Sequence, residues 1–421
     1  MHFQRSRFLP WISAACLGAA LLAGAAWAGT AEGVRAYDRG QFALAAKELQ
    51  PAAQAGDPEA QFHLGLMHDF GKGVQLDHAK AAALYRKAAE QGHADAQYHL
   101  AVSYDDGEGV PQDFKQAVYW YTQAANQGLA KAQYNLGVSY DKGEGVAKDH
   151  QMAAQWYRKA ADQGDSDAQY NLGVAYDEGE GVPQDHQQAV AWYRKAAAQN
   201  HVRAQFNLAV SYDDGEGVAQ DKKQAVHWYT KAAEQGDADA QYHLAVSYDD
   251  GEGVPQDFKQ AVYWYTQAAN QGLAKAQYNL GVSYDKGEGV AKDHQMAAQW
   301  YRKAADQGDS DAQYNLGVAY DEGEGVPQDH QQAVAWYRKA AAQNHVRAQF
   351  NLAVSYDDGE GVAQDKKQAV HWYTKAAEQG DADAQQNLSV MYARGEGVAR
   401  DATKSRYWAR KARESRARGE D

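Results

Sequence analysis

The 421-residue sequence contains one cysteine, seven prolines and a single isoleucine. A disulfide-stapled scaffold needs several cysteines, and collagen needs much more proline with glycine at every third position, so the composition excludes both classes. Leucine, isoleucine, valine and phenylalanine make up only about 14% of the chain, which is low for an ordinary hydrophobic core. No long apolar run follows residue 28, and this excludes a protein with several membrane spans.

Aromatic residues and alanine take the place of the missing aliphatic residues. The chain has 28 tyrosines and 11 tryptophans, and they recur at a fixed interval. Its formal net charge of −14 disfavours a surface that binds nucleic acid along the whole chain. We therefore expect a folded acidic protein without nucleic-acid partners.

The first 28 residues have the pattern of a secretory signal peptide. Arg5 and Arg7 precede an apolar stretch over 10–28, which ends in the small-x-small sequence Ala26-Trp27-Ala28. We predict cleavage after Ala28 and a periplasmic or secreted bacterial protein with no membrane span after cleavage. An uncleaved membrane anchor is the alternative, because the apolar stretch approaches spanning length. The only cysteine, Cys16, lies inside this segment, so the mature chain would have none.

A 36-residue period organises the rest of the chain. Residues 94–241 are also identical to residues 238–385, a duplication of 144 residues, or four periods. Such a period predicts repeated supersecondary units that bury their apolar faces only by stacking. The pair Ala-Gln marks the period with glutamine at positions 61, 97, 133, 169, 205, 241, 277, 313, 349 and 385.

Each unit reads as two helices joined by a loop. Ala96, Leu100 and Tyr104 are spaced four apart and predict one inward helical face, and a similar stripe follows in the second half of the unit. An aspartate such as Asp113 stands at the predicted start of each second helix, where a carboxylate caps free N–H groups. Two glycines precede it in the loop, and Gly ends most second helices. Asn200 and Asn344 replace that Gly, and asparagine also tolerates the left-handed conformation.

These motifs resemble the Sel-one-like repeat (SLR) family. The matching pattern is Ala-Gln-Tyr-Asn-Leu-Gly-Val-x-Tyr, then Gly-x-Gly-Val, then Asp-x-x-x-Ala-x-x-Trp-Tyr-x-Lys-Ala-Ala-x-Gln-Gly. The resemblance implies an all-α fold, a right-handed α/α superhelical solenoid of ten helix-loop-helix repeats over 57–421. Residues 29–56 would form a shortened capping hairpin, and a basic helix would end the chain. The family implies scaffold and adaptor roles, often in bacterial envelopes. Relatives described as β-lactamase-like have paired cysteines, which this chain lacks.

The resemblance places the first helix of each repeat on a concave surface, and one stripe of these helices is the candidate partner site. The stripe is a ladder of aromatic rings edged with carboxylates, which could hold an extended peptide, a basic partner helix or a glycan. Alternatively, the rings pack on neighbouring repeats and the carboxylates form a solvated rim. The candidate residues are Tyr98, Asp105, Tyr134, Asp141, Tyr170, Asp177, Phe206, Asp213, Tyr242, Asp249, Tyr278, Asp285, Tyr314, Asp321, Phe350 and Asp357.

No motif predicts a catalytic residue, a cofactor or a metal. The loop Asp105-Asp106-Gly-Glu108 offers oxygen ligands, but its spacing differs from that of known calcium loops. Ser139-x-x-Lys142, repeated at 283–286, matches one element of penicillin-interacting enzymes, but the companion Lys-Thr-Gly strand is missing.

We therefore predict a non-enzymatic scaffold that binds a protein or peptide, which could be basic. A cell-wall or exopolysaccharide-binding protein is the second interpretation, and a β-lactamase-like hydrolase is the third. The basic final helix either suits its own C-terminal dipole or contacts an anionic partner.

Overall fold

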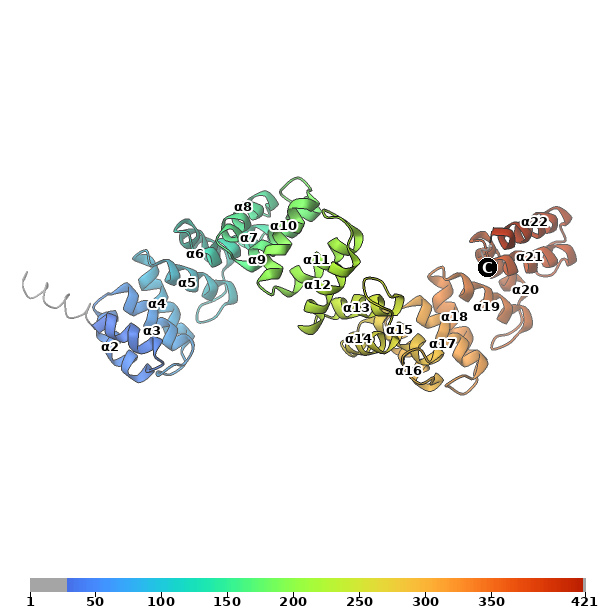
Figure 1. Ribbon diagram of the computed structural model, residues 1–421, viewed down its shortest axis with the longest axis horizontal. Helices are drawn as coiled ribbons and strands as arrows, with labels where there is room; N and C mark the ends of the chain where they lie inside the picture. The colour runs from blue at the N-terminus through green and yellow to red at the C-terminus, as the bar shows by residue number, and fades with distance from the viewer. Residues whose placement is uncertain (1–28, 419–421) are drawn as a thin grey trace, which may run out of the picture. The chain divides into compact units, whose positions relative to one another are not determined.

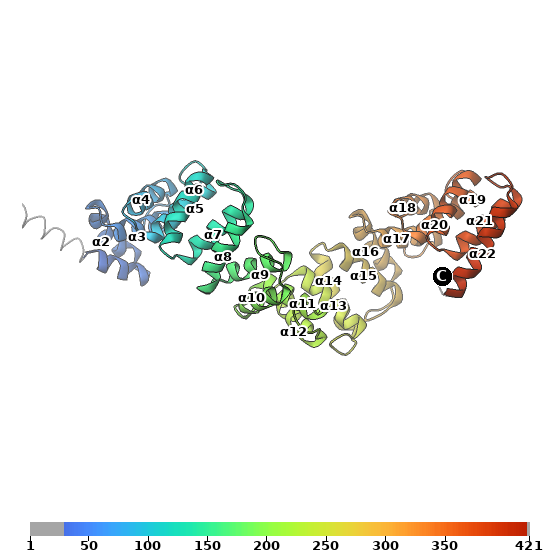
Figure 2. The same cartoon turned by 90° about the horizontal axis from the view of Figure 1, so that it is seen from above.

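The computed structural model describes residues 29–418, and the described residues are helices and loops without a β-strand. The predicted signal peptide, residues 1–28, lies outside the described residues. Helices pair into hairpins that follow one another along the chain (Figure 1), and the turned view shows the same succession (Figure 2). No helix between residues 29 and 418 is both long and apolar enough to cross a membrane.

All the labelled repeat helices have 13 residues except α3 and the final helix α22. Residues 29–38 are also helical and precede α2. The bounds are α2 Phe42–Gln54, α3 Pro58–Asp69, α4 His78–Glu90, α5 Ala94–Asp106, α6 Phe114–Asn126, α7 Ala130–Lys142, α8 His150–Asp162, α9 Ser166–Glu178, α10 His186–Ala198, α11 Val202–Asp214, α12 Lys222–Glu234, α13 Ala238–Asp250, α14 Phe258–Asn270, α15 Ala274–Lys286, α16 His294–Asp306, α17 Ser310–Glu322, α18 His330–Ala342, α19 Val346–Asp358, α20 Lys366–Glu378, α21 Ala382–Arg394 and α22 Ala402–Arg418.

The chain forms two compact units. The first unit runs to Ala204 and also includes 216–218, whereas the second comprises 205–215 and the chain from Ala219 onward. Within each unit a first helix packs against the second helix of its own repeat, and that second helix packs against the next first helix. This pairing of neighbours confirms the predicted stacking of helical hairpins.

Aspartate caps begin the second helices, as predicted. In α6, one Asp113 carboxylate oxygen accepts hydrogen bonds from the backbone N–H groups of Lys115 and Gln116 at 3.0 and 3.1 Å. Asp401 does the same for α22 at 2.9 and 3.0 Å. Because the first N–H groups of a helix have no partner within the helix, each such cap stabilises a helix start.

The left-handed positions also match the prediction. Gly143 closes α7 with φ 77°, and Asn200 and Asn344 adopt φ of 64° and 66°. At Gly145, with φ 74°, the loop touches the preceding repeat so closely that a Cβ would overlap the carbonyl of Phe114. Glycine is therefore required there both for its conformation and for the close approach of two repeats.

Small residues let large rings fill the core. Tyr121 is buried in one cluster with Ala101 and Ala117. Gly137 leaves room for the ring of Tyr157, whose carbon atoms a Cβ would meet at 2.7 Å. The prediction that Ala96 and Leu100 face inward is confirmed.

Tyr104, which shares the predicted inward stripe with Ala96 and Leu100, is only half-buried. Its hydroxyl is long enough to reach the surface, where it accepts a hydrogen bond from Arg86 at 2.6 Å. A tyrosine at the end of the stripe can thus pack its ring and keep its polar tip in contact with a charged partner.

A buried glutamine in each repeat links three helices. The Gln97 side-chain amide donates to the carbonyl of Ala89 in the preceding helix at 3.1 Å, and its oxygen accepts from Gln127 at 2.8 Å. The Gln–Gln bond recurs in the pairs 61–91, 97–127, 133–163, 169–199, 205–235, 241–271, 277–307, 313–343 and 349–379.

We expect the protein to lose stability when one of these buried glutamines is replaced. Gln241→Met should lower the free energy of unfolding by about 1–2 kcal/mol, because two largely buried hydrogen bonds disappear while the volume is kept. Gln260→Met on the exposed surface of α14 is the matched control and should change stability by less than about 0.5 kcal/mol. Urea unfolding measures both. If Gln241→Met and Gln260→Met lowered the free energy of unfolding by the same amount, the Gln241 hydrogen bonds would contribute nothing to stability.

Two half-buried histidines predict a pH effect. His99 and His243 lie beside Tyr85 and Tyr229, each with ring centroids 5.2 Å apart, and burial lowers the pKa of both histidines. Since their folded-state pKa lies below the unfolded value, their contribution to stability is present above pH of about 6.5 and is lost as the pH falls.

Other repeats carry asparagine at this position, so His99→Asn with His243→Asn is a conservative comparison. Between about pH 7.5 and pH 5, the parent chain should lose more stability than the double variant, as measured by urea unfolding at each pH. Parallel losses in the two proteins would contradict the effect of burial.

Candidate functional site

The predicted aromatic ladder lies on the first helices and is anchored by packing. We call this stripe the first-helix face, and all sixteen of its predicted residues are half-buried. The ring of Tyr98 lies 6.0 Å from that of Tyr121 in the second helix of the same repeat. The same pairing recurs at Tyr134–Tyr157, Tyr170–Tyr193, Phe206–Tyr229, Tyr242–Tyr265, Tyr278–Tyr301, Tyr314–Tyr337 and Phe350–Tyr373.

The aspartates of the first-helix face take part in hydrogen bonds within their repeats. The Tyr121 hydroxyl donates to Asp105 at 3.1 Å, and burial raises the pKa of Tyr121 well above its usual range, so the donor keeps its proton. Burial likewise raises the pKa of the Asp105 carboxyl. Corresponding Tyr–Asp bonds join 85 to 69, 193 to 177, 229 to 213, 265 to 249 and 337 to 321.

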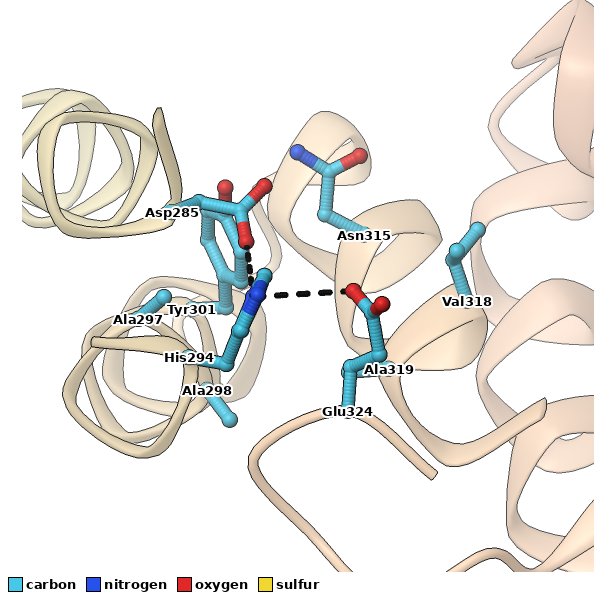
Figure 3. Close-up of a pocket in the computed structure, with 9 residues that line it drawn as sticks. All are labelled: Asp285, His294, Ala297, Ala298, Tyr301, Asn315, Val318, Ala319 and Glu324. Atoms are coloured by element: carbon cyan, nitrogen blue, oxygen red, sulfur yellow. Dashed lines mark hydrogen bonds and ion pairs between the residues drawn. The ribbon is translucent and has the colours of Figure 1, made fainter. Parts of the chain in front are cut away.

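A histidine or lysine at the start of the second helix meets many of these aspartates. His294 Nδ1 lies 2.7 Å from Asp285 Oδ1 and 3.5 Å from Glu324 Oε2, which belongs to the next repeat. We call these three residues the His294 cluster. Their side chains converge beside Tyr301 and Asn315 at a small hollow of about 70 Å³ (Figure 3).

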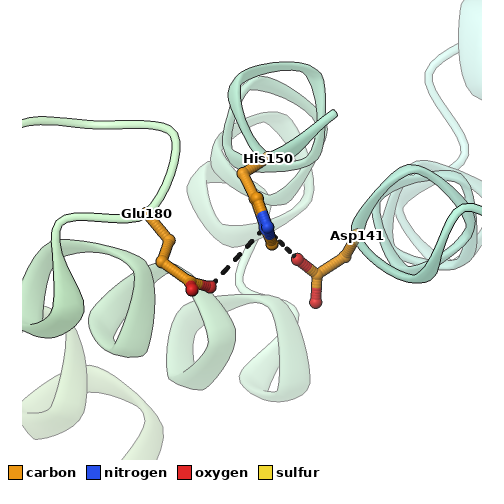
Figure 4. A group of neighbouring side chains, drawn as sticks. All are labelled: Asp141, His150 and Glu180. Carbon is orange, nitrogen blue, oxygen red and sulfur yellow. Dashed lines mark hydrogen bonds and ion pairs between the residues drawn. The ribbon is translucent and has the colours of Figure 1, made fainter. Parts of the chain in front are cut away.

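The duplication supplies a second copy, the His150 cluster of Asp141, His150 and Glu180. His150 Nδ1 is again 2.7 Å from the aspartate and 3.5 Å from the glutamate (Figure 4). Glu180 reaches His150 because Gly181 packs directly on the backbone of His150, where an added Cβ would overlap the carbonyl oxygen. In each cluster the three ligand atoms lie within 4.8 Å of one another.

A larger hollow of about 440 Å³ lies on the first-helix face of the first unit. We call it the Tyr170 hollow. His201 stacks on Tyr170 with ring centroids 4.8 Å apart and bonds Asp167 at 3.2 Å, so the ring is held in place. Tyr134, Asn171, Val202 and Arg203 complete its lining.

The second unit repeats this stacked arrangement. His345 lies 4.8 Å from Tyr314, at the same interplanar angle of 23°, and 3.1 Å from Asp311. Burial lowers the pKa of His201 and of His345, which favours neutral rings in both places.

The structure therefore brings together two of the predicted ladder residues, Tyr134 and Tyr170, at one hollow. The other ladder residues lie at the equivalent positions of their own repeats. Sequence reasoning did not identify the contribution of His201, or the convergence of aspartate, histidine and glutamate. An Asp followed by His after nine residues and Glu after a further 30 occurs in both clusters, but the same spacing occurs at 69–78–108, 177–186–216 and 321–330–360, so spacing alone does not identify the clusters.

The serine motif shows no arrangement for nucleophilic chemistry. Ser139 is 6% exposed, and its hydroxyl donates to the carbonyl of Asn135 in its own helix at 3.0 Å. Lys142 instead lies near Glu144, at 3.8 Å. Ser283 makes the same bond to Asn279 at 3.1 Å. Ser139 and Ser283 are therefore ordinary buried helix residues of α7 and α15.

Comparisons with known proteins agree with the fold. The family model "Sel1 repeat" matches ten consecutive segments, at 58–93, 94–129, 130–165, 166–201, 202–237, 238–273, 274–309, 310–345, 346–381 and 382–415. A comparison with curated proteins gave no match.

Two solved structures are similar over most of this chain. One is c5321, a protective antigen of uropathogenic Escherichia coli with an SLR fold. It is 38% identical with a TM-score of 0.68, and the match covers 89% of this chain and 90% of that one. The other is a Sel1 repeat protein from Oxalobacter formigenes, 38% identical with a TM-score of 0.56, covering 72% of this chain and 87% of that one. The ten matched repeats and these structures show that the chain belongs to the Sel1 repeat family.

Proposed function

We propose that this protein is an exported, non-enzymatic scaffold that binds a protein or peptide partner on its first-helix face. The observation that carries the proposal is the Tyr170 hollow, in which aromatic, amide and charged side chains from successive first helices surround one open space. Sel1 repeat proteins generally act as protein-interaction scaffolds, and the proposal places that role on a particular surface of this chain.

The hollow is preorganised for binding. Tyr170 is held between Tyr193 of its own repeat and His201 of the next loop. A ring that is already fixed loses little conformational entropy when a partner covers it, so more of the contact energy appears as affinity. Tyrosine also offers an apolar face together with a hydroxyl, which suits a mixed peptide surface.

Charge around the hollow favours a peptide with a basic residue. The Asp167 side chain is 60% exposed although one of its oxygens contacts His201, so the carboxylate remains accessible to solvent. Arg203 provides an opposite charge at the same hollow, which can orient a partner that carries both signs. The overall net charge of −14 adds a general attraction for basic partners.

The duplication predicts two equivalent sites per chain. Tyr278, Tyr314, Asp311 and His345 repeat the residues of the Tyr170 hollow 144 positions later, in the second unit. Two copies of a short partner could bind, or one long partner could engage both sites and gain avidity from the linkage.

A glycan is the second candidate ligand, because half-exposed tyrosine rings also suit the faces of sugar rings. The two candidates differ in what a cross-linking group on the hollow would capture. A polypeptide would identify a protein partner, and a cell-wall or exopolysaccharide fragment would identify a glycan.

Site-specific cross-linking tests the proposed surface. A photo-reactive phenylalanine analogue placed at Tyr170 or Tyr314 should capture the same polypeptide from an envelope extract of the source organism. The matched controls are Tyr119 and Tyr263, which are 51% and 52% exposed on second helices and should capture little. Preferential capture at Tyr119 and Tyr263 would place binding on another face and contradict the proposal.

Once a short protein partner has been captured, titration calorimetry should find two equivalents per chain, one with Tyr314→Ala and none with Tyr170→Ala combined with Tyr314→Ala. Loss of each ring removes an anchor that aromatic side chains commonly provide, so affinity at that site should fall by at least about tenfold. Unchanged binding by the double variant would contradict the proposal.

A further inference from the structure

We propose that the His150 cluster binds one divalent transition-metal ion of the zinc class, and that the His294 cluster binds a second. Each cluster joins two neighbouring repeats, since its glutamate comes from the loop of the following repeat. None of the cluster residues lines the Tyr170 hollow, and the metal proposal does not depend on the proposed scaffold function.

The ligand set suits zinc. One imidazole nitrogen and two carboxylate oxygens are ligands that Zn²⁺ accepts, with a water molecule completing four-coordination. Bonds of about 2.0–2.2 Å in a tetrahedron place ligand atoms about 3.4 Å apart. His150 Nδ1 and Glu180 Oε2 are already 3.5 Å apart, whereas His150 Nδ1 and Asp141 Oδ1 are 2.7 Å apart. A small rotation of Asp141 would therefore admit the ion.

The clusters are accessible and have room for an ion with water. In the His150 cluster the side chains of Asp141, His150 and Glu180 are 41%, 31% and 52% exposed. The adjoining hollow has a volume of about 60 Å³, which exceeds the space that one water molecule requires. Asn171 and Tyr157 also line this hollow and offer polar atoms to coordinated water.

Charge favours a divalent ion at this place. When the imidazole nitrogen binds the ion as a neutral ligand, the two carboxylates contribute two negative charges, which one divalent ion neutralises. Another repeat meets the same need with lysine, where Lys222 Nζ lies 2.8 Å from Asp213 and 3.0 Å from Glu252. A protonated lysine supplies a positive charge but has no lone pair for a metal. This repeat is thus a natural version of the cluster in which lysine replaces the imidazole ligand.

The remaining repeats explain why two sites are expected. His186 contacts Asp177 at 2.7 Å, and among the described residues no glutamate oxygen lies within ion-pair distance of this histidine; His330 has the same arrangement with Asp321. His78 contacts Asp69 at 2.9 Å, but Glu108 lies farther from it, at 4.0 Å. Phe114 and Phe258 replace the histidine in two further repeats. Only the His150 and His294 clusters combine three ligand atoms within 4.8 Å among the described residues.

Metal titration of the purified, untagged chain tests the proposal. Isothermal titration with Zn²⁺ in a non-chelating buffer should give two equivalents per chain. His150→Lys should leave one, and His150→Lys combined with His294→Lys should leave none. The lysine variants should fold like the parent, because Lys222 already occupies the equivalent position between two carboxylates. Zn²⁺ should raise the thermal midpoint of the parent but not that of the double variant.

The matched control is His186→Lys combined with His330→Lys, which changes the same kind of histidine outside the two clusters and should leave two equivalents. Circular dichroism confirms that each variant is folded. The proposal is overturned if the parent binds no Zn²⁺, or if the folded His150→Lys, His294→Lys variant still binds two equivalents.

Discussion

One buried glutamine per repeat forms hydrogen bonds to two second helices and fixes how three helices meet in the stack. Gln97 illustrates the arrangement, because it contacts the preceding second helix through its amide and the following one through its oxygen. Alanine, leucine and tyrosine side chains form the buried core, and the directional glutamine bonds add a fixed geometry where three helices meet. At the end of the array the pattern stops, since Ser415 stands where another glutamine would be, and the Gln385 oxygen has no partner among the described residues.

This framework separates the residues that stack repeats from those that could bind ligands. The glutamine, the alanines and the caps are nearly constant from repeat to repeat, whereas the first position of the second helix changes. It is histidine at 150, phenylalanine at 114 and lysine at 222. The backbone places each of these side chains beside an aspartate and the following loop. One structural position can therefore hold a hydrophobic residue, a fixed positive charge or a metal ligand.

Much of the fold was predictable because its signals are local. Asp113 and Gly143 act within one helix end, and the 36-residue period shows that the same ends recur. Tyr104 was only partly predicted, because helical spacing indicates a direction and not how far a long side chain reaches.

The clusters were not predicted, since their residues come from three separate elements. Their convergence depends on the close approach of Gly181 to the backbone of His150, which no spacing rule expresses. Only the tyrosines of the Tyr170 hollow were predicted, because the hollow also combines residues from separate elements. Its tyrosines follow the repeat, but His201 reaches it from the following loop.

The central claim is that each repeat is stabilised mainly by its immediate neighbours, and a deletion tests it most directly. Removing residues 94–237 takes out four of the ten repeats, and the duplication ensures that every junction in the shortened chain already exists in the full one. The account predicts a soluble six-repeat protein with the same helical content per residue by circular dichroism and a cooperative unfolding transition. An aggregated chain, or one with clearly less helix per residue, would contradict it.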